Sequence, residues 1–383
     1  QPRGILQTHR PDRPAPGTCL TSMNEKRTIL HIIDYMGRGG AEVMLVKVLK
    51  ELKEYYNIVV TLNPQNHFGD EFTCDEYHCL NMGSFARFPL AVLRMRRFMR
   101  NRKIDLVHSH LFSATLVARL AIPASVPLAT TIHTNVSTRE YKKWYIRMLE
   151  KSSYRRHRST MIGVSTGVLD QYFNFFGHTP WQKYLLYTFV DLRALEQPYE
   201  TPVVEKKPGY FTLAAIGALR FPKNQQYLVR AFEELKDEKF ELHIYGTGVQ
   251  HAEIDKMIRD TGVNVILKGE VKNASRLLPQ YDLYVMPSQF EGFSLSILET
   301  MAIGTPMLLS NIPSFREQCA DTAIFFDLED TGDFIQKLKM LAADPALRQR
   351  LSDAARQRVQ KQFTLEHHME GLRKIYSRIL TNT

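Results

Sequence analysis

The chain lacks any hydrophobic run long enough to span a bilayer, for which about 20 consecutive apolar residues are needed. Contact with a membrane is therefore expected only at the surface. Cysteine is also scarce: of the four in 383 residues, the pair Cys74/Cys79 has no matching second pair and no cluster of histidines beside it. A structural zinc site is not expected, and free thiols in a reducing cytosol are the favoured interpretation.

The second half of the chain lacks net charge, whereas the first half is basic. Residues 23–202 carry 24 basic and 16 acidic side chains, and residues 203–383 carry 23 of each. Two segments supply most of the excess, Arg87–Lys103 with seven basic residues and Arg139–Arg158 with eight, and both interleave them with apolar side chains. Such segments can bind anionic lipid, with about 1 kcal/mol of binding free energy for each basic residue near the surface. Alternatively, they can be helices whose basic side chains are solvated. We favour an anionic membrane surface as partner, met by Arg94, Arg96, Arg97 and Arg100.

Short apolar runs alternate with helix-length segments twice along the chain, which predicts parallel sheets with helices on both faces. Between the two series, residues 191–209 contain three prolines and no long apolar run, as in a linker. The fold class is therefore α/β, with two Rossmann-like domains facing a cleft and ligands at the carboxyl ends of the strands. We expect a disordered extension over residues 1–22, an N-terminal domain over 23–190 and a C-terminal domain over 210–364. The expected strands are Thr28–Asp34, Asn57–Leu62, Ile104–His108, Leu128–Ile132, Met161–Val164, Phe211–Ile216, Glu241–Tyr245, Val263–Leu267, Leu283–Met286 and Met307–Leu309.

The segment Met286–Gly304, MPSQFEGFSLSILETMAIG, is the most informative. It predicts a strand that ends at Met286, a loop through Gly292, and a helix that begins near Ser294, which is the expected N-cap. Unpaired N–H groups at Phe293, Ser294 and Leu295, together with the helix dipole, suit a diphosphate, and glycine before them allows its close approach. Two carboxylates flank this site: Glu291 could address a sugar, and Glu299, two turns along the helix, ribose hydroxyls. On their spacing alone, a solvated loop acid and a helix-surface acid are the favoured interpretation.

These residues resemble family 4 of the retaining glycosyltransferases. The family's E-x7-E motif, usually written E-G-F/S-G-x-x-x-x-E-A-M-A-x-G-x-P, matches residues 291–306, with Ser294 for the usual glycine and Thr300 for the usual alanine. The resemblance covers nearly all of Thr28–Leu380. It implies a GT-B fold, a nucleotide-sugar donor, and a last helix, over residues 365–383, that crosses back to the first domain.

The resemblance also implies roles for residues outside this motif. Gly39 and Gly40 match a glycine-rich turn near the donor phosphate, and His133 in TTIHTN matches a histidine that touches the transferred sugar. The segment DLVHSH, with His108 and His110, is similar to a further family segment and carries less weight.

In the second domain, Lys223 in IGALRFPKNQ matches a lysine that pairs with the diphosphate. The usual arginine is replaced by Ala218, and Arg220 is the candidate substitute; the alternative for Arg220 is a surface arginine. The turn with Gly246 and Gly248 would flank the nucleotide, and the backbone at Val271 would meet the base.

These features predict a metal-independent hexosyltransferase without a cofactor, and the resemblance implies that it retains the configuration of the sugar. The expected catalytic set is Glu291, His133, Lys223 and Arg220. The sequence lacks a D-x-D cluster that could hold a metal ion. The basic groups would therefore stabilise the departing diphosphate in place of a metal. We expect a UDP-sugar donor and a lipid-linked, polysaccharide or lipopolysaccharide acceptor at the inner face of the cytoplasmic membrane. Two alternatives remain open: another two-domain nucleotide-sugar enzyme, such as an epimerase or a phosphorylase, and a basic nucleic-acid-binding protein. No nucleic-acid partner is expected, because no known module for one appears.

Overall fold

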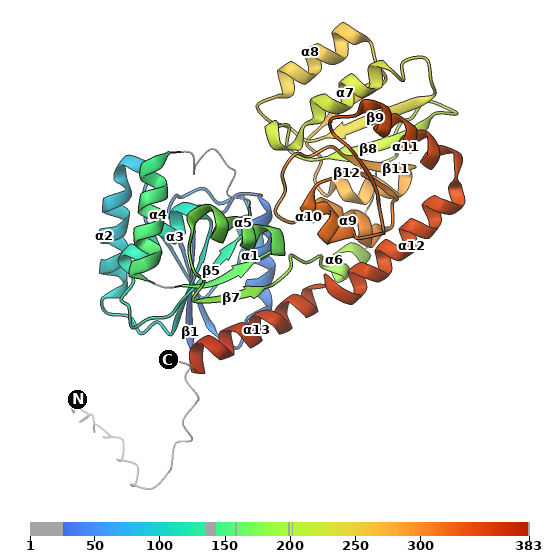
Figure 1. Cartoon of the computed structure of the whole chain (residues 1–383). Helices are drawn as coiled ribbons and strands as arrows, with labels where there is room; N and C mark the ends of the chain where they lie inside the picture. Colours follow the sequence, from blue (N-terminus) through green and yellow to red (C-terminus); the bar gives the residue numbers. More distant parts are fainter. Residues whose placement is uncertain (1–25, 135–142, 158, 198–199, 201, 382–383) are drawn as a thin grey trace, which may run out of the picture.

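The computed structural model describes residues 26–134, 143–157, 159–197, 200 and 202–381, and it contains two α/β domains (Figure 1). The expected extension over residues 1–22 lies outside the described residues, as do residues 139–142 and 158 of the second basic segment. Among the described residues, no helix is long and apolar enough to cross a membrane.

The N-terminal domain is built on a seven-stranded sheet in the order β3-β2-β1-β4-β5-β6-β7, with every neighbouring pair parallel. Its strands are β1 (Thr28–Ile33), β2 (Tyr56–Thr61), β3 (Glu76–Cys79), β4 (Leu106–His110), β5 (Leu128–Ile132), β6 (Thr160–Gly163) and β7 (Gln182–Leu185). Its helices are α1 (Gly40–Glu51), α2 (Phe88–Met99), α3 (Phe112–Ala121), α4 (Trp144–Arg156) and α5 (Thr166–Phe176). The central strands are buried throughout because helices cover both faces, as parallel sheets require.

The C-terminal domain repeats this plan on a six-stranded sheet in the order β10-β9-β8-β11-β12-β13, also entirely parallel. Its strands are β8 (Phe211–Ile216), β9 (Phe240–Tyr245), β10 (Val265–Gly269), β11 (Leu283–Met286), β12 (Met307–Ser310) and β13 (Ile324–Phe326). Its helices are α7 (Gln225–Glu233), α8 (His251–Thr261), α9 (Leu295–Ile303), α10 (Pro313–Cys319), α11 (Thr331–Ala343) and α12 (Pro345–Gln362). The two sheets confirm the predicted fold class, a pair of Rossmann-like domains.

The strand orders decide where ligands can bind. In both sheets the order reverses beside the first strand, between β1 and β4 in one domain and between β8 and β11 in the other. Ligands of open parallel sheets bind in the crevice at the carboxyl ends of the strands at such a switch point. The β8/β11 switch point contains Lys223 and the E-x7-E segment, and the β1/β4 switch point contains the Gly39-Gly40 turn.

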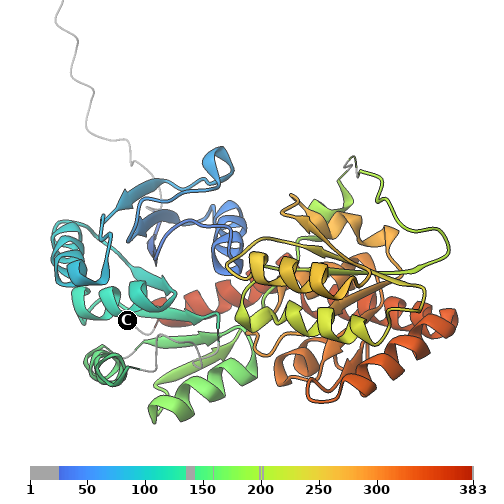
Figure 2. The same ribbon diagram turned by 90° about the horizontal axis from the view of Figure 1, so that it is seen from above.

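The chain crosses between the domains twice. The first crossing follows β7 and includes the short helix α6 (Leu192–Glu196), within the segment expected to be a linker. The second is made by α12 and by α13 (Leu365–Thr381), which passes beneath the N-terminal domain (Figures 1 and 2). Leu372, Ile375 and Tyr376 of α13 pack in the core of that domain with Ile29 and Leu106, so α13 is part of its fold.

Three strands were missing from the sequence-based prediction: β3, β7 and β13. They lie at the ends of their sheets, where one strand edge has no partner. β3 (EYHC) and β7 (QKYL) are only partly buried, so neither carries the apolar run by which the central strands are recognised. β13 (IFF) has three residues, too few to show a period.

Candidate active site

Lys223 and Glu291 form an ion pair at the β8/β11 switch point. The Nζ of Lys223, in a short 3-10 turn (Phe221–Lys223) after β8, lies 2.6 Å from Oε1 of Glu291, in the loop between β11 and α9. The hydroxyl of Ser288 donates to the same carboxylate oxygen at 3.1 Å. Both charged side chains are mostly buried, with 13% and 15% exposed. The structure therefore brings together two residues that lie 68 positions apart in the sequence.

The start of helix α9 differs in two respects from the prediction. Ser294 precedes the helix, but its hydroxyl makes no capping bond and instead lies 3.1 Å from the hydroxyl of Ser296. Its N–H donates to Oε1 of Gln318 at 3.0 Å, and the amide of Gln318 donates back to the Ser294 carbonyl at 2.8 Å. The Ser294 N–H was expected to meet the diphosphate and is already used. The N–H groups of Leu295 and Ser296 remain in the first turn, where a helix supplies no acceptor of its own.

The two domains touch at this loop. A Cβ added to Gly292 would lie 2.2 Å from the backbone oxygen of His133, at the end of β5 in the other domain. A Cβ added to Gly40, at the start of α1, would lie 3.5 Å from the side chain of Leu295. The Gly39-Gly40 turn, His133 and the start of α9 therefore face one another across the interdomain boundary, as a donor bound between the domains would require.

His133 is held as a neutral ring. Burial, and then the nearby His368, lower the pKa of His133 to about 3. Its Nε2 lies 3.2 Å from Nδ1 of His110, at the end of β4. At neutral pH this imidazole can donate or accept a hydrogen bond, but it carries no charge that would stabilise a diphosphate.

Glu299 lies on α9, partly buried between the domains. Burial raises the pKa of its carboxyl, while a hydrogen bond with Ser275 and the charges of Lys47 and Arg276 oppose that shift. Lys47 belongs to α1, so the carboxylate interacts with groups of both domains. An ionised Glu299 would offer acceptors for hydroxyl groups of a ligand in the cleft.

The predicted nucleotide-flanking glycines are required by packing. A Cβ at Gly246, whose φ is 135°, would lie 2.1 Å from the carbonyl oxygen of Gly217. A Cβ at Gly248 would lie 2.3 Å from the carbonyl oxygen of Leu219. Glycine at these two positions therefore lets the turn after β9 pack closely against the loop that leads to Lys223. Val271, in the loop after β10, packs partly buried against the core of this domain.

The remaining predicted residues lie elsewhere. Arg220 is exposed at the start of the 3-10 turn that carries Lys223. Arg94, Arg96 and Arg97 of α2, and Arg100 directly after it, are exposed. Helix α2 lies on the side of the N-terminal domain away from the other domain (Figure 1). Arg94 donates to the backbone carbonyls of Leu80 and Asn81, and Arg96 to that of Leu120. At least these two therefore also bind the ends of neighbouring elements.

Sequence reasoning missed several groups around the site. Gln318, on α10, occupies the Ser294 N–H, and Lys47 and Ser275 interact with Glu299. None of the three lies within a recognisable motif, because each reaches the site from a different element. The structure also places a third histidine, His31, beside the pair of the DLVHSH segment. A histidine within the predicted strand Thr28–Asp34 was the available signal.

Comparisons with known proteins agree with this geometry. Two family models match the chain: Glycosyltransferase Family 4 over residues 38–194 and Glycosyl transferases group 1 over residues 198–358. The N-acetylgalactosamine-N,N'-diacetylbacillosaminyl-diphospho-undecaprenol 4-alpha-N-acetylgalactosaminyltransferase of Campylobacter jejuni is 23% identical over 342 residues, 84% of this chain and 92% of the relative. The capsular polysaccharide biosynthesis glycosyltransferase CapH of Staphylococcus aureus is 25% identical over 307 residues, 76% and 82% of the two chains. The solved structure of Anabaena HepE in complex with UDP and glucose has a TM-score of 0.77 at 16% identity, with 92% of this chain and 99% of that chain covered.

Two Rossmann-like domains that meet at such a site are the architecture of the GT-B glycosyltransferases. The chain belongs to family 4 of these enzymes, and the resemblance noted in the sequence is confirmed.

Proposed function

We propose that the protein transfers a hexose-type sugar from a UDP-sugar, with retention of configuration, to a lipid-linked or polysaccharide acceptor such as a lipopolysaccharide precursor. The observation that carries this proposal is the Lys223–Glu291 pair beside the start of α9, facing His133 of the other domain. A relative that acts on a diphospho-undecaprenol substrate and a similar structure that holds UDP and glucose support the choice of acceptor and donor.

The reaction breaks the bond between the anomeric carbon and the diphosphate. In the front-face attack that we propose, an acceptor oxygen bonds to that carbon on the side from which the diphosphate leaves, and its proton passes to the departing phosphate oxygen. Lys223 and the N–H groups at the start of α9 stabilise the charge that grows on the diphosphate. Glu291 orients the sugar hydroxyls and the neutral His133 hydrogen-bonds to the sugar. The ammonium of Lys223 has three N–H donors, so it can contact the diphosphate while it keeps its bond to Glu291.

The nucleotide is the first point to test. Thermal unfolding would be followed with UDP, GDP, ADP and CDP in turn, since a ligand that binds only the folded protein raises its unfolding midpoint. We expect the largest shift with UDP. Turnover of the corresponding UDP-sugars, with release of UDP, then separates transfer from epimerisation, which releases none. Equal shifts with all four nucleotides, or none, would contradict a UDP-sugar donor.

We also propose that the leaving diphosphate needs no divalent cation, because fixed positive groups face it. Turnover after EDTA treatment should then not depend on added Mg²⁺ or Mn²⁺. A loss of turnover that either ion restores would contradict this part of the mechanism.

Arg220 is proposed as the substitute for the arginine that is replaced at Ala218. It lies three residues before Lys223, at the start of the same turn. Arg220→Ala should therefore lower the rate at saturating donor in the same direction as loss of Lys223. An unchanged rate would show that Arg220 is a surface residue without a role in binding the diphosphate.

We propose that the acceptor is reached by peripheral binding to the inner face of the cytoplasmic membrane, through the outer faces of α2 and α4. On α4, Trp144 and Met148 are 71% and 59% exposed, and they line a surface hollow together with Arg147, Lys151 and Arg155. Exposed apolar side chains among basic ones suit the boundary of an anionic bilayer. Leu93, 58% exposed on α2, extends this character to the second helix.

Vesicle sedimentation tests this surface. Because Arg94 and Arg96 bind backbone carbonyls, the variant should instead combine Arg97→Glu with Lys151→Glu. We expect less sedimentation with anionic vesicles and unchanged UDP affinity. The matched control is the double reversal Lys256→Glu with Arg259→Glu on α8, where both residues are exposed in the other domain. Equal vesicle binding by the first variant and the parent would contradict the membrane surface and would show that the basic side chains of α2 and α4 are only solvated.

A further inference from the structure

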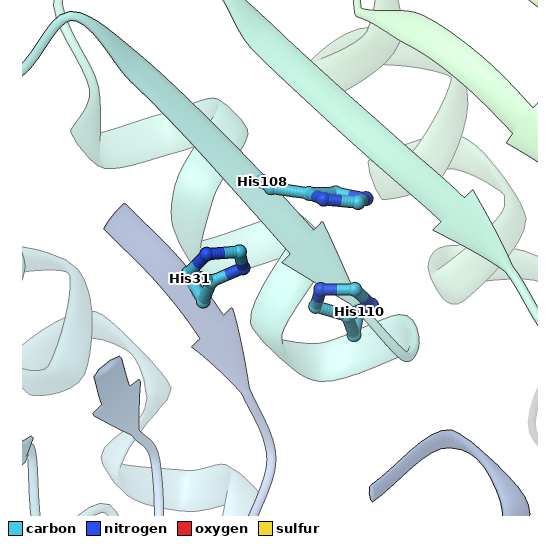
Figure 3. A group of neighbouring side chains, drawn as sticks. All are labelled: His31, His108 and His110. Atoms are coloured by element: carbon cyan, nitrogen blue, oxygen red, sulfur yellow. The ribbon is translucent and has the colours of Figure 1, made fainter. Parts of the chain in front are cut away.

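Three buried histidines share one face of the N-terminal sheet beside the β1/β4 switch point (Figure 3). His31 on β1 pairs in register with His108 on the parallel neighbour β4, and His110 follows two residues later, so all three side chains leave the sheet on the same side. All three are buried, with exposed fractions of 0% for His31, 3% for His108 and 6% for His110. One ring nitrogen from each lies within 4.8 Å of the other two.

Within the described part of the chain, two of these rings contain a buried nitrogen without a hydrogen-bond partner. The Asn57 amide donates to the carbonyls of Leu52 and Tyr55, so its oxygen faces His31 and must accept from Nε2 of that ring, 3.4 Å away. His31 then carries its proton on Nε2, and Nδ1, which has no hydrogen-bond partner, is a bare lone pair. An unsatisfied polar atom in the interior is costly and calls for an explanation such as a bound ion.

His110 has the same feature. Its Nδ1 lies 3.2 Å from Nε2 of His133, and its own Nε2 is buried without a partner. When Nδ1–H of His110 donates to His133, the unpartnered Nε2 is a second bare lone pair. Burial keeps the three rings neutral at pH 7, because it holds the pKa of each well below its usual value.

The three histidines border a small cavity. It has a volume of about 20 Å³ and is closed by Met44 and Val48 of α1 and by His368 and Leu372 of α13. This is enough for one water-sized particle, which needs about 10–15 Å³. The described residues that line the cavity include no carboxylate, so an ion held here would have imidazole ligands.

We propose that His31, His108 and His110 bind one divalent first-row transition-metal ion, of which Zn²⁺ is the representative. Imidazole favours zinc, copper and nickel over Mg²⁺ and Ca²⁺, which require oxygen ligands, and three histidines with one open position are a known zinc ligand set. The ion would take the lone pairs of His31 Nδ1 and His110 Nε2.

The third ligand requires a local exchange. His108 bonds through Nδ1 to the hydroxyl of Tyr376 and through Nε2 to the hydroxyl of Thr131, both at 2.7 Å. Metal binding replaces the bond to Thr131, while Nδ1–H continues to donate to Tyr376, as ligating histidines commonly do to a second partner. Tetrahedral zinc with bonds of about 2.0–2.1 Å sets its nitrogens about 3.4 Å apart, so the rings must close by up to about 1.4 Å.

The ion would act on the proposed sugar site through one hydrogen bond. A metal on Nε2 of His110 fixes the proton on Nδ1, and that N–H then donates to Nε2 of His133. His133 is thereby held in the tautomer that carries its proton on Nδ1. This metal site rests on the histidine geometry alone and does not depend on the proposed donor or acceptor.

The test is metal binding by the full chain at pH 7, without an affinity tag. The purified protein is treated with EDTA, dialysed, and titrated with Zn²⁺ against a chromophoric chelator and separately with Co²⁺. We expect one equivalent of each, a rise of the thermal midpoint with Zn²⁺, and the visible absorption typical of tetrahedral Co²⁺ without a thiolate charge-transfer band. The last point separates the histidines from Cys74 and Cys79, which are free thiols.

Two ligand variants and a matched control locate the site. His31→Phe and His110→Phe should each lower zinc affinity by about 100-fold or more, beyond the loss of an outer-shell partner. His178→Phe should leave it unchanged, although His178 also has a buried nitrogen without a partner, because its ring stacks on Tyr154 away from the triad. The proposal is overturned if the parent chain takes up no stoichiometric Zn²⁺, if bound Co²⁺ is octahedral or thiolate-ligated, or if His31→Phe binds zinc as the parent does. Should His110→Phe not fold, the Co²⁺ spectrum of the parent still decides.

Discussion

Gly292 is the position where one added carbon should affect catalysis most. In Gly292→Ala the new Cβ would lie 2.2 Å from the backbone oxygen of His133, 3.1 Å from its carbonyl carbon and 3.3 Å from Cα of Thr134. All three atoms are backbone, so no side chain can rotate away. The backbone of Gly292 itself does not require glycine, because its φ lies outside the left-handed region. The conflict is therefore between the two domains.

The size of the effect follows from the geometry. Non-bonded carbon and oxygen atoms rest at a little over 3 Å, so the domains must separate by roughly 1 Å at this contact. A misplacement of about 1 Å between reacting groups can cost about 100-fold in rate, or about 2.7 kcal/mol in the activation barrier. We expect Gly292→Ala to lose about that factor in turnover at saturating UDP-sugar. UDP affinity should change little, since Lys223 and Glu299 belong to one domain.

Turnover, UDP affinity by calorimetry and thermal unfolding would be measured for Gly292→Ala and for the control Gly167→Ala. Gly167→Ala on α5 adds a Cβ with no described atom within 4 Å and should behave as the parent. If Gly292→Ala turns over like the parent, the domains do not need this contact and the reasoning fails. A large loss of UDP affinity instead would mean that Cβ blocks the ligand.

Four further changes have defined outcomes. Lys223→Ala should lower the rate at saturating donor by about 100-fold, more than it raises the donor KM, because the lost charge matters most on the departing diphosphate; near-normal turnover would place the phosphate contact elsewhere. Glu299→Ala should weaken UDP binding in calorimetry by removing an acceptor for ribose hydroxyls, and unchanged affinity would refute that role. Glu150→Ala should lower the free energy of unfolding by about 3–5 kcal/mol, because it leaves the fully buried Arg119 without its carboxylate; parent-like denaturant unfolding would contradict this. Burial lowers the pKa of His178 to about 4, so between about pH 6.5 and pH 4 the unfolded chain binds a proton at this residue and the folded chain does not. The stability that neutral His178 allows is therefore full above about pH 6.5 and is lost as the pH falls toward 4. His178→Phe should make the unfolding midpoint measurably less sensitive to acid over that window.

The local pattern of apolar and polar residues was sufficient to predict the class of fold. The central strands, the order of the helices and the proline-bearing segment between the two series all follow from periods that a short window reveals, and the E-x7-E segment carries its own strand, loop and helix. Two features were not predicted correctly. The edge strands were missed because they have no apolar run. The Ser294 N–H, expected to meet the diphosphate, donates instead to Gln318, a side chain 24 residues away that no pattern connects to it.

The sequence by itself determined which residues are candidates for the site, among them Glu291, Lys223 and His133. Only the tertiary structure decided which of them meet, because contacts between residues far apart in the chain depend on strand order and domain closure. Strand order brings Lys223 to Glu291, and closure brings Gly292 against His133. The register of β1 with β4 similarly brings separate histidines together as a triad that borders one cavity. A linear pattern records periods along one element, whereas these sites exist only where elements from distant parts of the chain lie side by side.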